Sequence, residues 1–217
     1  MVITMEQRWG SFAPILLLLS PGRNANRLFL IVRNDCPHPL VGGEGDDDLT
    51  PVPPVPHFSQ PRKMDELSGL VMNIVLPSTP PTNGRKYPVF QYVHGGSLLY
   101  GGANLPIFDA VNLVSQSLAI NRPVVCVNFN YRVGFGGFLA SKAIEEELRA
   151  DGYSGCGNFG FTDQKVAFDW VQKYIGYLGG DANHVTAVGE SAGGISISNQ
   201  VCILSETETQ DKMEVNS

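Results

Sequence analysis

The chain lacks the signatures of several common functional classes. Its four cysteines show neither a Cys-x-x-Cys pair nor metal-site spacing, so no redox motif, metal site or disulfide framework is indicated. No apolar stretch approaches the roughly 20 residues that a membrane-spanning helix needs. The net charge of −6 argues against a nucleic-acid partner and leaves no basic surface for membranes. What is left is an ordinary globular composition, 43% hydrophobic and 17% charged.

Two glycine-rich or acidic segments do not indicate a cofactor or metal either. Gly134-Phe135-Gly136-Gly137 lacks the glycine spacing and the strand-to-helix context of a dinucleotide site. The run Gly42 to Asp48 does not match a calcium loop, and such acidic runs are typical of solvated chain. We therefore expect no cofactor and no metal.

The most informative feature that is present is a serine between glycines. The motif Gly189-Glu190-Ser191-Ala192-Gly193 follows the apolar run Val185 to Val188. This pattern is typical of a nucleophile elbow, a strained strand-to-helix turn that lifts the serine hydroxyl clear of a sheet. Glycines flank the turn because a side chain there would collide with it. Ser191 is therefore a candidate acyl-transfer nucleophile, with Gly189, Glu190 and Gly193 as supports of the turn.

A second glycine-rich segment lies upstream. The run Tyr87 to Val93 predicts a strand, and His94-Gly95-Gly96-Ser97 follows it directly. Backbone N–H groups of such a loop can approach an attacked ester carbonyl closely and stabilise the charge that develops on its oxygen. The alternative is an ordinary Gly-Gly turn after a strand. Its pairing with the serine motif, in this order, favours the oxyanion loop.

The remaining patterns predict alternating strands and helices. Leu70 to Leu76 and Pro123 to Asn128 are further strands, the second apolar throughout, as in a strand covered on both faces. Asp163 to Tyr177 predicts an amphipathic helix with Asp163 as its N-cap; its apolar stripe consists of Val166, Ala167, Trp170, Val171, Tyr174 and Ile175. The fold class expected is α/β, with a mostly parallel sheet and helices on both faces.

At this point the chain resembles the type-B carboxylesterases, the cholinesterase-like branch of the α/β-hydrolases. The resemblance covers roughly Gly69 to Gln200, and four segments in the family's order carry it: Val93 to Ser97, Val127 to Phe138, Gly157 to Asp181, and His184 to Gly194. It implies the N-terminal portion of an α/β-hydrolase fold, with the later strands missing. It also implies a small-molecule carboxylic ester as the substrate.

The resemblance further implies a role for each motif. Ser191 would form an acyl-enzyme, while the N–H groups of Gly96, Ser97 and Ala192 hold the oxyanion. Gly95 and His94 would support the loop. Ser97 stands where the family commonly has a third glycine, which leaves the acyl and alcohol preference open.

The catalytic triad of such an enzyme is not complete in this sequence. In α/β-hydrolases the acid and then the histidine follow the serine, but all four histidines precede it: His38, His57, His94 and His184. His184 lies at the far end of a strand, roughly 15 Å from the serine. Losing the base costs on the order of a million-fold in turnover, so we expect a nearly inactive fragment that lacks the triad acid and histidine. The alternative is a non-catalytic cholinesterase-like interaction module.

Arg132 also needs an explanation, because it lies between Tyr131 and Val133 in a stretch that looks buried. A buried arginine requires an acidic partner. The family pairs it with a glutamate ahead of the first long strand, and Glu66 could serve here. A solvated loop arginine is the alternative.

The chain divides into three parts. Residues 51–204 form the N-terminal part of a carboxylesterase domain, beginning with the extended linker Pro51 to Pro56, and residues 205–217 form a polar tail. Residues 1–50 are a leader-like or disordered segment. Phe12 to Ser20 suggests a signal-peptide core, but Glu6 precedes it and no clean cleavage site follows. Secretion and a cytoplasmic location both stay open, as does the oligomeric state.

Overall fold

The computed structural model describes residues 69–103 and 105–202, together with five short strands nearer the N-terminus. Those strands, described through their backbone, are β1 (Thr4–Met5), β2 (Ile15–Pro21), β3 (Ala25–Leu30), β4 (Asn34–Asp35) and β5 (Lys63–Met64). The acidic run 42–48, the linker 51–56, Glu66 and the tail 205–217 lie outside the described residues. The three-part domain division therefore stays a prediction.

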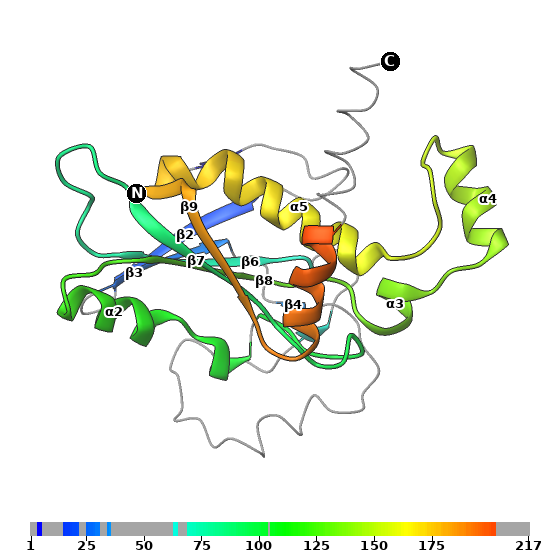
Figure 1. Ribbon diagram of the computed structural model, residues 1–217, viewed down its shortest axis with the longest axis horizontal. Helices are drawn as coiled ribbons and strands as arrows, with labels where there is room; N and C mark the ends of the chain where they lie inside the picture. Colours follow the sequence, from blue (N-terminus) through cyan, green and yellow to red (C-terminus); the bar gives the residue numbers. More distant parts are fainter. Residues whose placement is uncertain are drawn as a thin grey trace.

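A mixed sheet forms the centre of the molecule (Figure 1). Its strand order is β1-β2-β3-β6-β8-β7-β9. Pairing is antiparallel from β1 to β8, and it becomes parallel across β8, β7 and β9. The strands not yet bounded are β6 (Met72–Pro77), β7 (Tyr87–Val93), β8 (Val125–Phe129) and β9 (Gly180–Gly189). Strands β4 and β5 pair separately.

Helices cover both faces of this sheet (Figure 1). The helices are η2 (Pro106–Phe108), α2 (Val111–Ala119), α3 (Gly134–Phe138), α4 (Lys142–Ala150), α5 (Phe159–Tyr174), η3 (Ile175–Leu178) and a helix at residues 192–202. All of them except the helix at residues 192–202 lie in the long connections between the parallel strands β7, β8 and β9, as parallel pairing requires. Within the described residues, no helix is long and apolar enough to cross a membrane.

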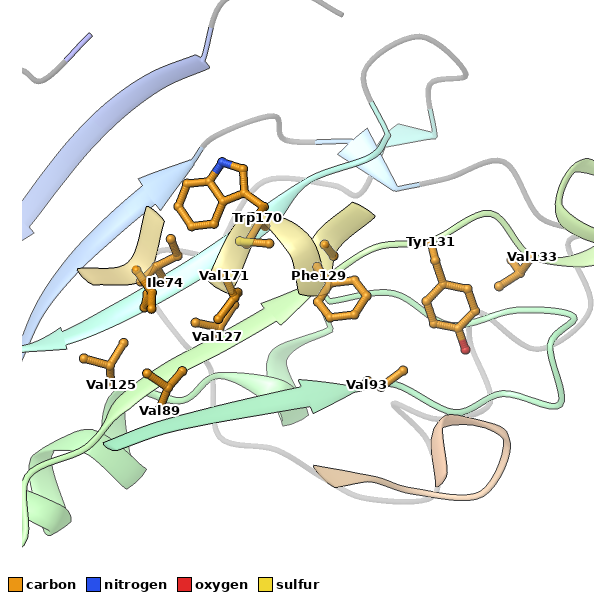
Figure 2. Packing of buried hydrophobic residues seen from close by; sticks show 13 residues of the cluster. Ile74, Val89, Val93, Val125, Val127, Phe129, Tyr131, Val133, Trp170 and Val171 are labelled. Carbon is orange, nitrogen blue, oxygen red and sulfur yellow. The ribbon is translucent and has the colours of Figure 1, made fainter. Parts of the chain in front are cut away.

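Strand β8 shows why the sheet is buried on both sides. All five of its residues are buried. Val125, Val127 and Phe129 pack with α5 in the larger core cluster (Figure 2), whereas Cys126 packs on the other face with Val114 of α2. Successive strand side chains point to opposite faces, so an unbroken apolar run is what a doubly covered strand needs.

The predicted strands agree with the structure, whereas the predicted helix Asp163 to Tyr177 starts earlier and ends three residues sooner, at Tyr174. Strand β7 has the expected bounds, and β6 and β8 differ from expectation by one or two residues at their ends. Helix α5 begins at Phe159, so Asp163 lies inside the helix and is not its N-cap. The N-cap is Asn158, which adopts a left-handed φ of +56°.

The apolar stripe of α5 is also shifted from the predicted one. Val166 is 39% exposed, whereas Gln164 is buried together with Ala167, Trp170 and Val171. The prediction used apolar residues alone to find the buried face, so it did not detect a face that also contains buried polar side chains.

Part of the predicted leader-like segment belongs to the sheet. Most of the apolar run Phe12 to Ser20 lies in β2, which pairs antiparallel with β3. Strand β3 in turn pairs with β6, so the sheet extends across the predicted boundary at residue 50.

Candidate active site

Ser191 stands at a sharp turn between β9 and the helix at residues 192–202. Strand β9 ends at Gly189, and the helix begins two residues after Glu190. Ser191 has a φ of +51° and is exposed. A non-glycine residue in this region of backbone space costs about 1–3 kcal/mol and persists only where surrounding structure enforces it. The turn therefore holds the serine side chain outward at the carboxyl end of the sheet.

The glycines of the turn allow a close approach that no other residue would. A Cβ atom added to Gly189 would collide with the backbone carbonyl group of Gly193. One added to Gly193 would collide with the carbonyl oxygen of Val93, at the end of β7. The first turn of the helix consequently packs directly on the ends of two neighbouring strands.

The loop after β7 lies beside the serine. A Cβ atom on Gly95 would lie 2.6 Å from Glu190 Oε2 and 3.3 Å from Ser191 Cβ. Gly96 has a φ of +102°, and its carbonyl oxygen accepts from the N–H groups of Leu99 at 2.9 Å and Tyr100 at 3.1 Å. The two glycine motifs of the sequence, more than ninety residues apart as their numbers show, thus meet at one edge.

Three backbone N–H groups of this junction have no loop or turn acceptor in the described residues. Among the loop and turn hydrogen bonds of the described residues, Gly96, Ser97 and Ala192 do not act as donors. Ala192 is in the first turn of its helix, where no intrahelical acceptor exists and the helix dipole favours negative charge. Such a set of donors can stabilise an oxyanion.

The loop holds strain of its own at Ser97. Ser97 and Leu98 both have left-handed φ values, +57° and +59°. The carbonyl oxygen of Leu98 accepts from Gly134 N at 2.6 Å, which ties this stretch to the start of α3. A serine therefore occupies a conformation that glycine would adopt without steric cost.

His94 is built into the loop. Its side chain is 1% exposed, and its Nδ1 lies 2.9 Å from the carbonyl oxygen of Gly95. Because a carbonyl only accepts, Nδ1 carries the hydrogen. The ring stacks on Tyr131 with centroids 4.2 Å apart, and a Cβ atom on Gly101 would lie 2.7 Å from Nδ1. These contacts fix the ring as a support for Gly95.

Of the other histidines, His184 is the one that the described residues include, and it does not lie beside the serine. His184 lies on β9, and at about 3.3 Å per strand residue it is roughly 15 Å or more from Ser191. His38 and His57 lie outside the described residues. Within the described part of the chain, no group of three or more His, Cys, Asp or Glu side chains could hold a metal ion.

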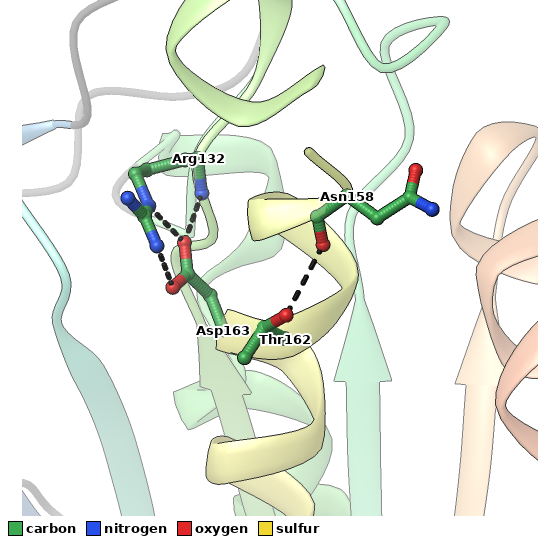
Figure 3. A network of polar contacts seen from close by, with 4 residues as sticks. All are labelled: Arg132, Asn158, Thr162 and Asp163. Atoms are coloured by element: carbon green, nitrogen blue, oxygen red, sulfur yellow. Dashed lines mark hydrogen bonds and ion pairs between the residues drawn. The ribbon is translucent and has the colours of Figure 1, made fainter. Parts of the chain in front are cut away.

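Arg132 is held by Asp163, which sequence reasoning had assigned to a helix cap (Figure 3). Arg132 Nε and Nη2 donate to the carboxylate of Asp163 at 2.8 and 2.9 Å, and the backbone N–H of Arg132 donates to it at 3.0 Å. Asp163 is 8% exposed. Of the two alternatives, the one with an acidic partner is confirmed, with the partner inside α5, although the Arg132 side chain is 41% exposed. The pair ties the segment after β8 to that helix.

Polar residues that the sequence analysis did not single out join the elbow helix to α5. Ser196 Oγ donates to Ala192 O at 2.7 Å and accepts from Gln164 Nε2 at 3.1 Å. Gln200 Nε2 donates to Phe161 O at 2.7 Å. These side chains are buried. Their amino acids carry no signal of burial in the sequence, because Ser and Gln are mostly exposed residues.

Tyr131 was likewise missed. It follows β8, is 1% exposed, and donates from its hydroxyl to His94 O at 2.7 Å. Its position directly after a buried strand and before Arg132 is the only sequence signal that could have drawn attention to it. Tyr92 is affected by its surroundings as well. Burial, and to a smaller extent the negative charge of Glu190, raise the pKa of Tyr92.

Comparison with known proteins agrees with these features. The sequence model of a family described as the carboxylesterase family matches residues 33–212. A carboxylic ester hydrolase from Gibberella moniliformis (strain M3125 / FGSC 7600) is 36% identical over 154 residues, which make up 70% of this chain and 27% of that protein. The para-nitrobenzyl esterase of Bacillus subtilis (strain 168) is 37% identical over 137 residues, 63% of this chain and 24% of that protein.

A solved structure of a thermophilic PNB esterase has the same arrangement of elements. It matches with a TM-score of 0.57 and 32% identity, over 77% of this chain and 29% of the solved chain. The expected α/β-hydrolase fold is thereby confirmed. The chain spans about a quarter of the length of the curated relatives it matches.

Proposed function

Because the chain belongs to the carboxylesterase family, we propose that Ser191 is the nucleophile of a carboxylic ester hydrolase. The observation that carries this proposal is the close approach of the two segments: a Cβ atom on Gly95 would lie 3.3 Å from Ser191 Cβ, and the serine has a φ of +51° and is exposed. A strained, outward serine beside a loop with free N–H donors matches the requirements of acyl transfer.

The reaction would proceed through an acyl-enzyme. Ser191 Oγ attacks the ester carbonyl carbon, and the carbonyl π electrons move to oxygen, where the N–H groups of Gly96, Ser97 and Ala192 stabilise the charge. Collapse of this intermediate breaks the bond to the alcohol, which leaves with a proton. Water then attacks the acyl group and releases the carboxylic acid. A donor of this kind is worth about 3–4 kcal/mol of barrier.

A base must accept the serine proton in the first step and return it to the alcohol. We propose that the histidine and the acid of the triad come from outside the part of the chain that the structure describes, because His94 supports the loop and His184 is distant. The relatives are about four times as long as the matched share of this chain, so a longer polypeptide is the first source to test.

Labelling with a fluorophosphonate and turnover of a p-nitrophenyl ester test the nucleophile. In a polypeptide that includes the downstream coding region, we expect labelling to be lost in Ser191→Ala and kept in Ser198→Ala, a matched control for an exposed serine of the same helix. Equal labelling of that polypeptide and its Ser191→Ala variant would contradict the proposal.

Turnover identifies the source of the base. We expect slow turnover by the chain alone and faster turnover when a polypeptide with the downstream coding region is used. Absence of turnover even then would favour the interaction module over the esterase.

A further inference from the structure

Tyr131 is placed where the oxyanion loop and the elbow helix meet. Its ring lies beyond the end of β8, and its hydroxyl points toward the segment that follows β7 (Figure 2). That hydroxyl donates to His94 O at 2.7 Å, while the ring stacks on the imidazole. Tyr131 therefore contacts both the backbone and the side chain of the residue that precedes Gly95.

The carbonyl group that accepts this hydrogen bond also lies against the elbow helix. A Cβ atom added to Gly193 would lie 2.9 Å from His94 O, so the helix turn that begins at Ala192 packs on this carbonyl group. Tyr131 thus holds a backbone group that lies between the loop with Gly96 and Ser97 and the helix turn with Ala192.

This link can control the separation of the two sets of donors. Gly193 already lies against the carbonyl oxygens of Val93 and His94, so the loop and the helix are in contact with little room to adjust. A misplacement of about 1 Å at reacting groups can cost on the order of a hundred-fold in rate. A tyrosine that holds the His94 carbonyl group against the helix turn would keep all three N–H groups aimed at one point.

We propose that Tyr131 is a positioning residue for acyl transfer, which sets the spacing between the N–H groups of Gly96 and Ser97 and that of Ala192. The inference rests on the proposed function of Ser191. Tyr131 does not touch the substrate in this proposal; it acts through the carbonyl group and the ring of His94.

The test compares labelling kinetics of wild type and Tyr131→Phe in a polypeptide that includes the downstream coding region. Phenylalanine keeps the ring stack and removes only the hydroxyl. We expect Tyr131→Phe to lower the maximal rate of fluorophosphonate labelling about tenfold, the upper range for loss of one hydrogen bond, while the half-saturating concentration changes less than about twofold.

Tyr87→Phe is the matched control. Tyr87 also donates its hydroxyl to a backbone carbonyl, that of Thr79 at 3.2 Å, at the opposite end of β7 from the loop. We expect this control to label at the wild-type rate. Labelling of Tyr131→Phe at the wild-type rate, or equal losses in both tyrosine variants, would overturn the inference.

Amide hydrogen exchange gives a readout that does not depend on labelling. We expect Tyr131→Phe to speed exchange about tenfold at Leu99 and Tyr100, which donate to Gly96 O, and at Ile195, which donates to Ser191 O. Faster exchange spread evenly over β7 and β8 would indicate general destabilisation and would overturn the inference. Absence of Ser191-dependent labelling would contradict the proposed function instead, and exchange alone would then decide the role of Tyr131.

Discussion

At the scale of single residues, the core contains one amide that the fold does not satisfy. Gln91 lies in the middle of β7 and is 1% exposed, and neither its Oε1 nor its Nε2 has a hydrogen-bond partner among the described residues. A buried polar group without a partner destabilises a protein by about 1–3 kcal/mol. The side chain lies on the same face of β7 as Val89 and Val93, which belong to the apolar core.

We therefore predict that Gln91→Met raises the free energy of unfolding by about 1–3 kcal/mol, because methionine has a similar shape and no unmet donor or acceptor. Urea denaturation monitored by circular dichroism measures the change. Gln164→Met is the matched control: that buried amide donates to Ser196 and should lose stability on substitution. Destabilisation by both substitutions would show that Gln91 is satisfied in solution.

At the scale of elements, the segment after β8 depends on α5 through Arg132 and Asp163. Asp163 is buried, whereas the Arg132 side chain is 41% exposed, so solvent screens part of the attraction. Three hydrogen bonds to one carboxylate remain as the larger contribution. The pair is adjacent in sequence to Tyr131, so it also fixes the backbone that carries the tyrosine.

Asp163→Ala should lower the free energy of unfolding by about 1–3 kcal/mol, because it removes these hydrogen bonds together with their charge. Thermal and urea denaturation measure the loss. Asp169→Ala is the control, since Asp169 forms an exposed pair with Lys165 one turn apart on the same helix and should change stability by less than about 0.5 kcal/mol. Equal losses in the two variants would mean that Asp163 contributes no more than a surface pair.

The same element shows what sequence could and could not predict. The β-strand residues of β7 and the unbroken apolar run of β8 indicated both strands, because the side chains on each face of a strand reflect whether that face is buried. The predicted start of α5 was wrong because the intrinsic helix propensity of Phe159-Gly160-Phe161 is low, which favours a loop. In the structure Gly160 lies against Arg132 O and the Phe138 ring, and Phe161 packs on Phe138 with centroids 5.2 Å apart. Contacts from a distant segment thus extend the helix.

The candidate site divides in the same way. Ser191 and the glycines around it stood out because their conformation needs particular residue types. Tyr131, Ser196 and Asp163 did not, since each acts through a partner more than thirty positions away, and one sequence carries no record of such pairs.

At the scale of the whole molecule, Cys126 makes global stability sensitive to alkaline pH. Burial raises the pKa of its thiol from 9.0 to about 12. Between these values the unfolded chain loses the thiol proton while the folded chain keeps it, so stability is full below about pH 9 and falls as pH rises. The loss approaches about 1.4 kcal/mol per pH unit.

We predict that the free energy of unfolding of Cys126→Ala falls less steeply between about pH 9 and 11 than that of wild type. At neutral pH the variant should be less stable than wild type, because a small cavity forms. Urea denaturation at a series of pH values measures this slope. Cys156→Ala, which removes an exposed thiol, should keep the wild-type slope. A wild-type slope in Cys126→Ala would show that other groups control alkaline unfolding.

The pairing of β7 with β9 has a consequence for how the molecule is made. Val93 is opposite Gly189 in this parallel pair, so the strands that bring the loop to the serine are separated by most of the described chain. Contacts of such high sequence separation form late, since the entropy of closing the intervening loop is lost before they form. During synthesis on a ribosome, β6, β7 and β8 can associate while the last strand is still inside the exit tunnel, and the reactive junction can appear only once that strand has emerged.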